Sequence, residues 1–163
     1  MTRLAVDLPG RIDLAEARRH LEAADWLGTP SEPPADRPGV RRYLTDLVLP
    51  LSTPGRPLEF RKAALVDLGP VVDRGSSLEV EISWQSATMA PLFPVFAGLL
   101  LVTPAGLVLE GAYAPPFGEA GMLIDRAALH FVARRTARWF LNRVGAELGL
   151  EPMSLGREPS PDR

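Results

Sequence analysis

The chain has 163 residues, a formal net charge of −2, 17 prolines and no cysteine. Its length fits a single domain, and 46% hydrophobic with 23% charged residues is typical of a globular protein. The lack of cysteine excludes disulfides, thiol nucleophiles and cysteine-ligated metal sites, and two histidines are too few for a histidine-rich metal site. We therefore expect no metal or cofactor. The acidic balance argues against nucleic-acid binding through bulk charge.

Neither a secretion signal nor a membrane span is expected, so we predict a cytoplasmic protein. The first residues lack the apolar core of a signal peptide. An uncharged stretch between Glu81 and Glu110 is long enough to cross a bilayer. However, Pro91, Pro94 and Pro104 interrupt it, and no cluster of basic residues flanks it. We interpret the stretch as two buried strands joined by a turn.

The first third of the chain predicts one strand, one helix and a loop. Hydrophobic alternation over 3–8 indicates the strand. The helix begins after Asp13, a capping residue with Glu16 at the capping-box position, and is expected to end at 28–30. Four prolines within 28–39 favour a surface loop without regular structure.

A series of strands is expected in the middle of the chain. The clearest covers 77–84, where apolar residues alternate with polar ones, so that one face is buried and the other is wet. Turn signals separate the strands at 50–57, at 69–75 and at 103–106. Together with the first strand this gives six, and short turns favour an antiparallel meander. The middle strands are expected at 40–51, 59–68, 77–84, 95–102 and 107–113.

A long amphipathic helix is predicted over 125–148, followed by a flexible polar tail over 151–163. We therefore expect a single domain at 1–150. Arg143 lies within the apolar arc of the helix and is expected to snorkel or to pair with Glu147. The opposite arc is rich in arginine, which favours a solvated face or a contact with an anionic partner. The apolar arc consists of Leu129, Val132, Ala133, Thr136, Ala137, Phe140 and Val144.

The predicted order of elements is a strand, a helix, five strands and a long C-terminal helix. This order, together with the segments 92–98, 111–116 and 130–141, resembles that of a known family. The chain resembles the START-like (SRPBCC) superfamily, which includes lipid-transfer domains and polyketide cyclase/dehydrase-like proteins. The resemblance covers roughly 1–148. It implies an α+β helix-grip fold, a curved antiparallel sheet packed on a long C-terminal helix that commonly encloses an apolar cavity. The family usually has seven strands and a second short helix, and it shares no universal catalytic residues.

The candidate ligand-binding residues face the expected space between sheet and helix. Small residues at the centre of the helix fit either a cavity or a close approach of the helix to the sheet, with the Thr136 hydroxyl bonded to its own helix. Gly98 and Gly111 also remove bulk. The aromatic residues would contact a ligand or anchor a core, and His130 is either a general acid or base or a boundary residue. The candidates are Tyr43, Trp84, Tyr113, Leu129, His130, Ala133, Thr136 and Phe140.

Three functions are compatible with this pattern. The first is binding of a small hydrophobic or amphipathic ligand in a cavity between the sheet and the C-terminal helix. The second is a polyketide cyclase/dehydrase-like enzyme that uses Tyr113, His130 and Thr136. The third is a packed protein-interaction module, a homodimer included, that associates through edge strands or the apolar hairpin at 92–109. The sequence leaves open whether any reaction is catalysed.

Overall fold

The computed structural model describes residues 2–53, 56–88, 95–114 and 126–151, with 49–53, 56–60 and 126–129 described by their backbone alone. Within these residues, seven strands form one open antiparallel sheet in the order β1-β7-β6-β5-β4-β3-β2. The fold is α+β, with a C-terminal helix. The elements are β1 (Thr2–Pro9), α1 (Leu14–Glu22), β2 (Thr29–Ser31), β3 (Arg41–Thr53), β4 (Arg56–Asp73), β5 (Leu78–Ser86), β6 (Val95–Thr103), β7 (Gly106–Ala114) and α2 (Arg126–Glu147).

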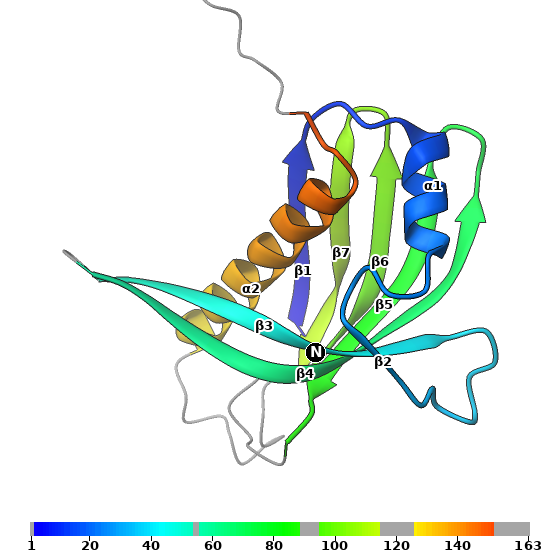
Figure 1. The fold of residues 1–163 in the computed structure, drawn as a ribbon. Coiled ribbons are helices and arrows are strands. Elements are labelled where there is room, and N and C mark those ends of the chain that lie inside the picture. Colours follow the sequence, from blue (N-terminus) through cyan, green and yellow to red (C-terminus); the bar gives the residue numbers. More distant parts are fainter. Residues whose placement is uncertain (1, 54–55, 89–94, 115–125, 152–163) are drawn as a thin grey trace, which may run out of the picture.

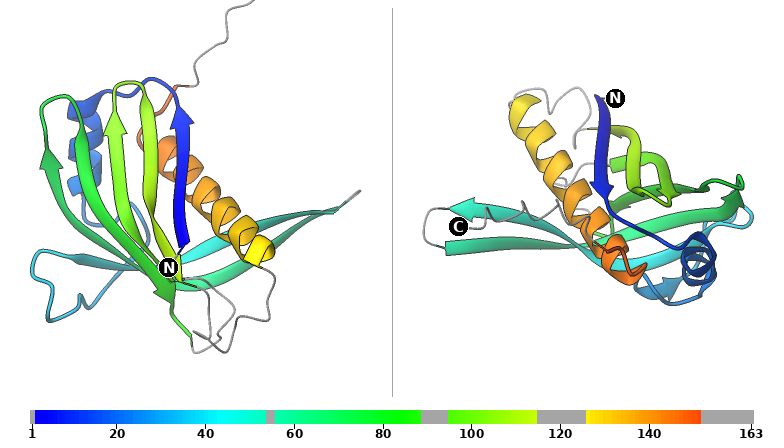
Figure 2. Two further views of the ribbon diagram at one scale, coloured as in Figure 1. Left: turned by 180° about the vertical axis from the view of Figure 1, so that it is seen from behind. Right: turned by 90° about the horizontal axis from the view of Figure 1, so that it is seen from above.

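Both helices pack on one side of the sheet, which we call the inner face (Figure 1). The long helix α2 crosses the sheet and contacts β1, β7 and β3, whereas α1 contacts β4 and β6. Seen from behind, both helices lie beyond the strands, and we call this side the outer face (Figure 2). The hydrophobic core therefore lies between the inner face and the two helices.

The alternation read from the sequence matches the burial of the strands. In β5, Leu78, Val80, Ile82 and Trp84 are at most 3% exposed, and the residues between them point away from the core. The predicted hairpin is formed by β6 and β7, with Gly106 at a φ of 138° in the turn. No helix among the described residues is long and apolar enough to cross a membrane.

The segment predicted to be an irregular loop contains a strand, so the expected count of six strands was wrong. Thr29–Ser31 pairs with β3, and Pro30 lies opposite Tyr43. Proline is tolerated there because β2 is an edge strand and needs no second set of N–H donors. No second helix follows α1 within 23–40.

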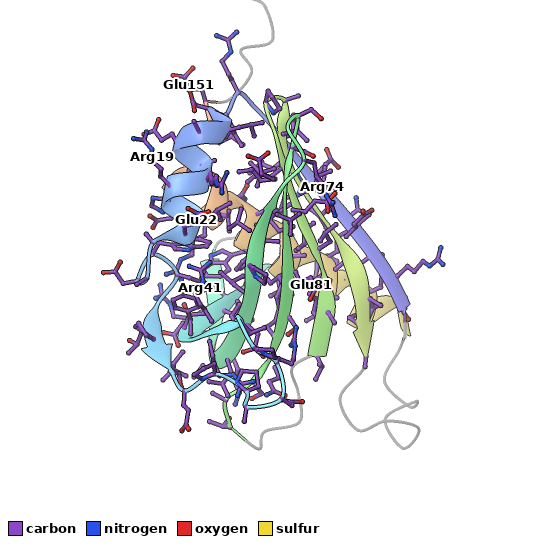
Figure 3. All side chains as sticks on the ribbon, turned by 90° about the vertical axis from the view of Figure 1, so that its right-hand side faces the viewer. Arg19, Glu22, Arg41, Arg74, Glu81 and Glu151 are labelled. Carbon is purple, nitrogen blue, oxygen red and sulfur yellow. The ribbon has the colours of Figure 1, made fainter. Side chains whose placement is uncertain are left out.

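Helix α1 begins as predicted but ends at Glu22, about a turn and a half before the predicted stop. The Asp13 carboxylate accepts from the Glu16 backbone N–H at 2.9 Å, which confirms the N-cap. At the other end, Arg41 of β3 reaches toward α1 (Figure 3) and donates to the carbonyls of Leu21 at 2.7 Å and Ala23 at 3.0 Å. A cation that caps the last carbonyls ends the helix without glycine.

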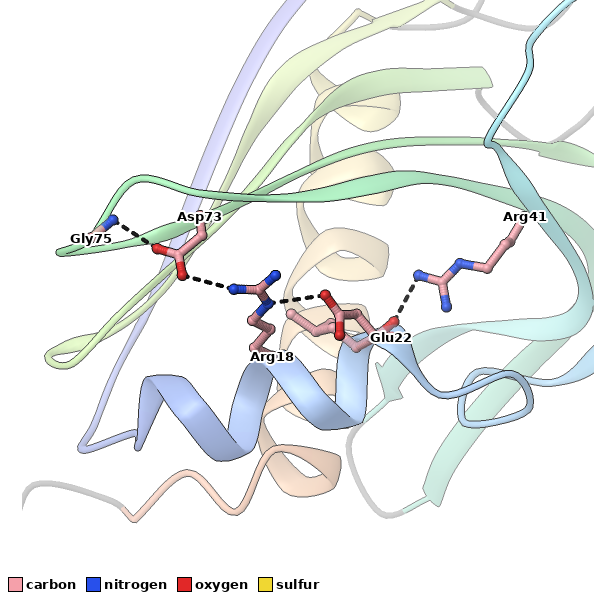
Figure 4. Close-up of polar contacts among 6 residues, drawn as sticks. Arg18, Glu22, Arg41, Asp73 and Gly75 are labelled. Atoms are coloured by element: carbon pink, nitrogen blue, oxygen red, sulfur yellow. Dashed lines mark hydrogen bonds and ion pairs between the residues drawn. The ribbon is translucent and has the colours of Figure 1, made fainter.

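The ion pairs of Arg18 tie α1 to the sheet. Its guanidinium donates to Glu22 in the same helix and to Asp73 at the end of β4 (Figure 4). The Asp73 carboxylate also accepts from the Gly75 N–H at 2.7 Å, where Gly75 has a φ of 84°. The hydrogen bond with Glu22 is the main reason why the pKa of Arg18 is raised.

The strands β3 and β4 are longer than predicted. The expected turn at 50–57 is strand up to Thr53 and again from Arg56. The expected turn at Gly69–Pro70 is a bulge within β4, because one extra residue is inserted between the pairs of Leu68 and Val71 with β5. Since β5 pairs with β4 only from Ala64 onward, the far part of the β3–β4 hairpin projects from the sheet as a two-stranded ribbon (Figure 1).

Helix α2 agrees with its predicted range over the residues described. Of the predicted apolar arc, Ala133, Thr136, Ala137, Phe140 and Val144 are buried, whereas Val132 is only partly buried. Arg138 lies on the opposite side and donates to the Asp7 carbonyl of edge strand β1 at 2.9 Å. This contact occupies an edge carbonyl that another strand could otherwise pair with.

After the helix, Glu151 exchanges two backbone hydrogen bonds with Arg11, so the expected flexible tail does not begin at Glu151. The rest of that tail lies outside the described residues.

Candidate functional site

A row of aromatic residues crosses the inner face of the sheet. Tyr43, Val66, Trp84, Phe96 and Tyr113 are register partners in turn across β3, β4, β5, β6 and β7. Each is at most 3% exposed. At about 4.8 Å between strands, the row spans roughly 19 Å. Three residues predicted from separate parts of the sequence thus share one line, which we call the aromatic row.

Near the middle of the row, helix α2 packs over it with Phe140 and several small residues. The Phe140 ring lies 5.6 Å from that of Trp84, and Trp84 stacks on Phe96 at 4.2 Å with a 19° angle between the rings. Ala133 and Thr136 are buried on the same side of the helix. The predicted residues Trp84 and Phe140 are therefore in contact, and small side chains lie beside them.

Three polar atoms near the row are buried without a hydrogen-bond partner. They are the Tyr43 hydroxyl, the Trp84 indole nitrogen and the Thr136 hydroxyl. The Thr136 hydroxyl is not bonded to its own helix, which was the alternative interpretation of this residue. An unpaired buried polar group costs about 1–3 kcal/mol, and such groups are usually satisfied by a protein group, a water molecule or a ligand.

Tyr113 and His130 meet at one end of the row. The Tyr113 hydroxyl lies 3.3 Å from Nδ1 of His130, and the two ring centroids are 6.1 Å apart. Tyr113 is buried, whereas His130 is partly exposed, so the pair lies at the boundary between core and solvent. A phenol bonded to an imidazole can donate to a ligand or move a proton.

Other predicted features are not brought together with this pair. Thr136 is six residues further along α2, which is about 9 Å of helix rise from His130. The expectation that Gly98 and Gly111 leave free space is wrong, because Cζ of Phe96 is 2.8 Å from the position of a Cβ on either glycine. The side chain of Leu129, also a predicted site residue, lies outside the described part of the chain.

The sequence did not reveal the partners of Arg143. Its guanidinium donates to the Thr45 hydroxyl at 3.1 Å and to the Leu27 carbonyl at 3.0 Å, instead of pairing with Glu147. Glu147 lies 3.6 Å from Nε2 of His20 in α1. Strand alternation places Thr45 on the inner face, but its partner on α2 could not be read from local spacing.

The described residues also bear on cofactors and on cavities. Among them, no group of three His, Asp or Glu side chains could hold a metal ion. A shallow hollow of about 580 Å³ lies on the outer face, over β1, β7 and β6, and not beneath α2.

Comparison with protein-family models, curated proteins and solved structures found no match to this chain. The chemistry of the candidate site therefore has to be argued from its own geometry.

Proposed function

We propose that the chain binds a small hydrophobic or amphipathic molecule between the inner face of the sheet and α2. The observation that carries this proposal is the set of three buried, unpartnered polar atoms on Tyr43, Trp84 and Thr136. Binding sites for small molecules combine apolar and aromatic walls with a few converging polar groups. The aromatic row and the inner side of α2 have this composition.

The strand order supports the helix-grip assignment that the sequence resemblance implies. The sheet runs β1-β7-β6-β5-β4-β3-β2, and the C-terminal helix contacts β1 and β7 near one edge and β3 near the other. Because the helix contacts strands near both edges of the inner face, its middle section is the place where a ligand would replace side-chain packing. That middle section carries Ala133 and Thr136.

The unpartnered atoms define the chemistry of the ligand. An indole N–H can only donate a hydrogen bond, and the two hydroxyls have free donors as well. No side chain of the aromatic row is charged. We therefore expect a neutral, largely planar molecule that carries acceptor oxygens, in preference to a fatty acid whose carboxylate would be buried without a partner.

Three probes test this proposal on the full chain. Flavone is planar and has a carbonyl acceptor, phenanthrene is planar without one, and laurate is a carboxylate. Flavone should raise the unfolding temperature and quench tryptophan fluorescence most strongly. Trp84→Phe keeps a ring and removes the N–H, so it should weaken flavone binding about tenfold and leave phenanthrene binding unchanged.

Trp139→Phe is the matched control, because Trp139 is partly exposed on α2 and lies outside the row. It should not alter flavone binding. Thr136→Val, which keeps the shape of the side chain, should reproduce the loss seen with Trp84→Phe. The proposal fails if none of the probes changes the unfolding temperature, or if Trp84→Phe and Trp139→Phe behave alike.

The Tyr113–His130 contact favours a polyketide cyclase/dehydrase-like enzyme as the second candidate. In such a reaction His130 would accept the α-proton of a poly-β-ketone, and Tyr113 would protonate the attacked carbonyl as the new C–C bond forms. The proton on His130 would return to the Tyr113 oxygen across their hydrogen bond, and loss of the new hydroxyl together with a second α-hydrogen would release water and leave a C=C bond. A linear poly-β-ketone thioester should then be cyclised, and Tyr113→Phe should slow turnover by about 100-fold while flavone still binds. Absence of turnover would leave only the binding function.

A further inference from the structure

The outer face is apolar over the strands at one side of the sheet. The residues that point outward from β6 and β7 are mostly aliphatic, whereas the neighbouring edge strand β1 presents Arg3, Ala5 and Asp7 on this face. Val95 is 43% exposed, and no helix in the described part of the chain covers these positions. We call this surface the apolar outer patch, and it consists of Ala5, Val95, Ala97, Leu99, Leu101, Val108, Ala112 and Ala114.

The other side of the outer face is covered by the chain itself. Asp67 of β4 is only 7% exposed and accepts two hydrogen bonds from Arg42, at 2.6 and 2.9 Å. Arg37, from the segment between β2 and β3, lies 3.6 Å from Asp67 and 3.8 Å from Glu81 of β5. The outer face thus has two parts. In the ionic part, charged side chains pair with one another, whereas the apolar part is not covered by any other described segment of the chain.

Two opposite charges flank the hollow in the apolar outer patch. The hollow of about 580 Å³ lies between Arg3 of β1 and Glu110 of β7, and it is floored by Ala5, Leu99 and Ala112 with the backbone of neighbouring strands. Arg3 pairs in register with Ala112, and Glu110 with Ala5, so the two charges are diagonal neighbours. Both are exposed, and neither forms an ion pair with another described residue.

We propose that the apolar outer patch is the interface with a second copy of this chain. A twofold axis between Arg3 and Glu110 places each Arg3 opposite Glu110 of the partner subunit, so one surface satisfies both halves of the contact. The aliphatic residues then pack sheet against sheet, at the roughly 10 Å separation of facing sheets. The charge pattern favours a second copy of the chain because the arginine of each copy faces the glutamate of the other.

The size of the patch predicts a weak dimer. Three strands of eight or nine residues give a footprint of about 410 Å² per chain, from about 4.8 Å between strands and 3.3 Å per residue. A standard interface buries roughly 800 Å² per partner. A dissociation constant in the micromolar range is therefore expected. The inner face and its aromatic row take no part, so this interface is independent of the proposed ligand binding.

Sedimentation velocity of the full chain over a concentration series tests the interface. Glu110→Arg places four positive charges around the axis and should weaken dimerisation at least about tenfold, as should Arg3→Glu with four negative ones. The double variant with both substitutions restores complementarity and should recover the dimer. Asp46→Arg is the matched control, because Asp46 is an exposed acid on the outer side of β3, away from the patch.

Circular dichroism and thermal unfolding establish that each variant is folded. The inference is overturned if the wild-type chain stays monomeric at millimolar concentration, which would leave the patch to a different partner or to solvent. It is equally overturned if a dimer forms but neither charge reversal weakens it, since the copies would then meet elsewhere. A loss in both single variants without recovery in the double variant also contradicts the Arg3–Glu110 pairing.

Discussion

The two faces of the sheet are formed by the same strands but differ in burial. Along β6, Leu100 points inward and is fully buried, whereas Leu101 points outward and keeps part of its surface exposed. The inner face is closed by α1 and α2, and the outer face by neither. Strand alternation therefore sorts residues into two sets, but covering elements decide which set becomes the core.

The outer face itself is divided. Its ionic part is held by Arg42, Asp67 and Arg37, and its apolar part has no cover among the described residues. Figure 3 shows Arg74 and Glu81 on this side of the molecule, at the turn and along β5. The difference between the parts is chemical, because the backbone pairing continues across both without interruption.

Adjacent leucines in β6 should give the largest contrast. Leu100→Ala should lower the free energy of unfolding by about 2–5 kcal/mol, because it removes methylene groups from a closed core and leaves a cavity. Leu101→Ala should lower it by less than about 1 kcal/mol. Urea unfolding at a concentration where the chain is monomeric measures both. Equal losses would mean that the outer face is as closed as the inner one.

The glycine pair should give the next largest effect. Gly98→Ala places a methyl group against the Glu110 carbonyl oxygen and 2.8 Å from Cα of Gly111. Since both atoms belong to the neighbouring strand, the strands must move apart, at a cost of about 3 kcal/mol. Ala97→Ser, one residue earlier on the outer face, should be nearly neutral. Thermal unfolding of the two variants separates the faces, and an unchanged Gly98→Ala protein would contradict the close approach.

The ionic part of the outer face should show the smallest of these effects. Hydrogen bonding to Asp67 raises the pKa of Arg42. Arg42→Ala would leave the Asp67 carboxylate buried, with Arg37 at 3.6 Å as its remaining cationic partner among the described residues. We expect a loss of about 2 kcal/mol in the free energy of unfolding. Arg74→Ala removes an ion pair with Glu79 whose arginine is 59% exposed, and should cost at most about 0.5 kcal/mol. Similar losses in both variants would contradict the importance of burial.

Local patterns were sufficient for most elements and for several contacts. Alternation located β1, β5, β6 and β7, and the 3.6-residue period located α2. The N-cap at Asp13 was predicted from residue type and spacing alone. These features depend on neighbours within about four residues along the chain, so the local residue pattern is enough to predict them.

Boundaries that depend on distant partners were missed. The early end of α1 follows from Arg41, a residue of β3 that supplies hydrogen bonds to the last carbonyls. Residues Thr29–Ser31 become a strand because β3 offers an edge, in spite of Pro30. The bulge at Gly69–Pro70 continues β4 because the pairing with β5 resumes one residue later. In each case hydrogen bonds to a distant segment, and not the local signal, set the boundary.

The candidate site shows the same division. Tyr43, Trp84 and Tyr113 could each be placed on the buried side of a strand, but their alignment in one row depends on register, and register is set by pairing across four strand boundaries. Phe96 was not singled out, although it fills the space over the two glycines. The contact of Tyr113 with His130 likewise required α2 to fold back over β7.

By itself, the sequence determined the chemistry available to this protein. With no cysteine, it excluded thiol chemistry and left hydroxyls, carboxylates, arginines, one lysine and two imidazoles as the main reactive groups. The alternation of apolar and polar residues indicated the strands, several of which contain proline. The tertiary structure decided which of these groups meet. It brought His130 to Tyr113 and, among the described residues, left three polar atoms without a partner and the outer patch without cover. The reason is that residue type and local spacing act over a few residues, whereas register and helix docking are set by contacts between distant segments.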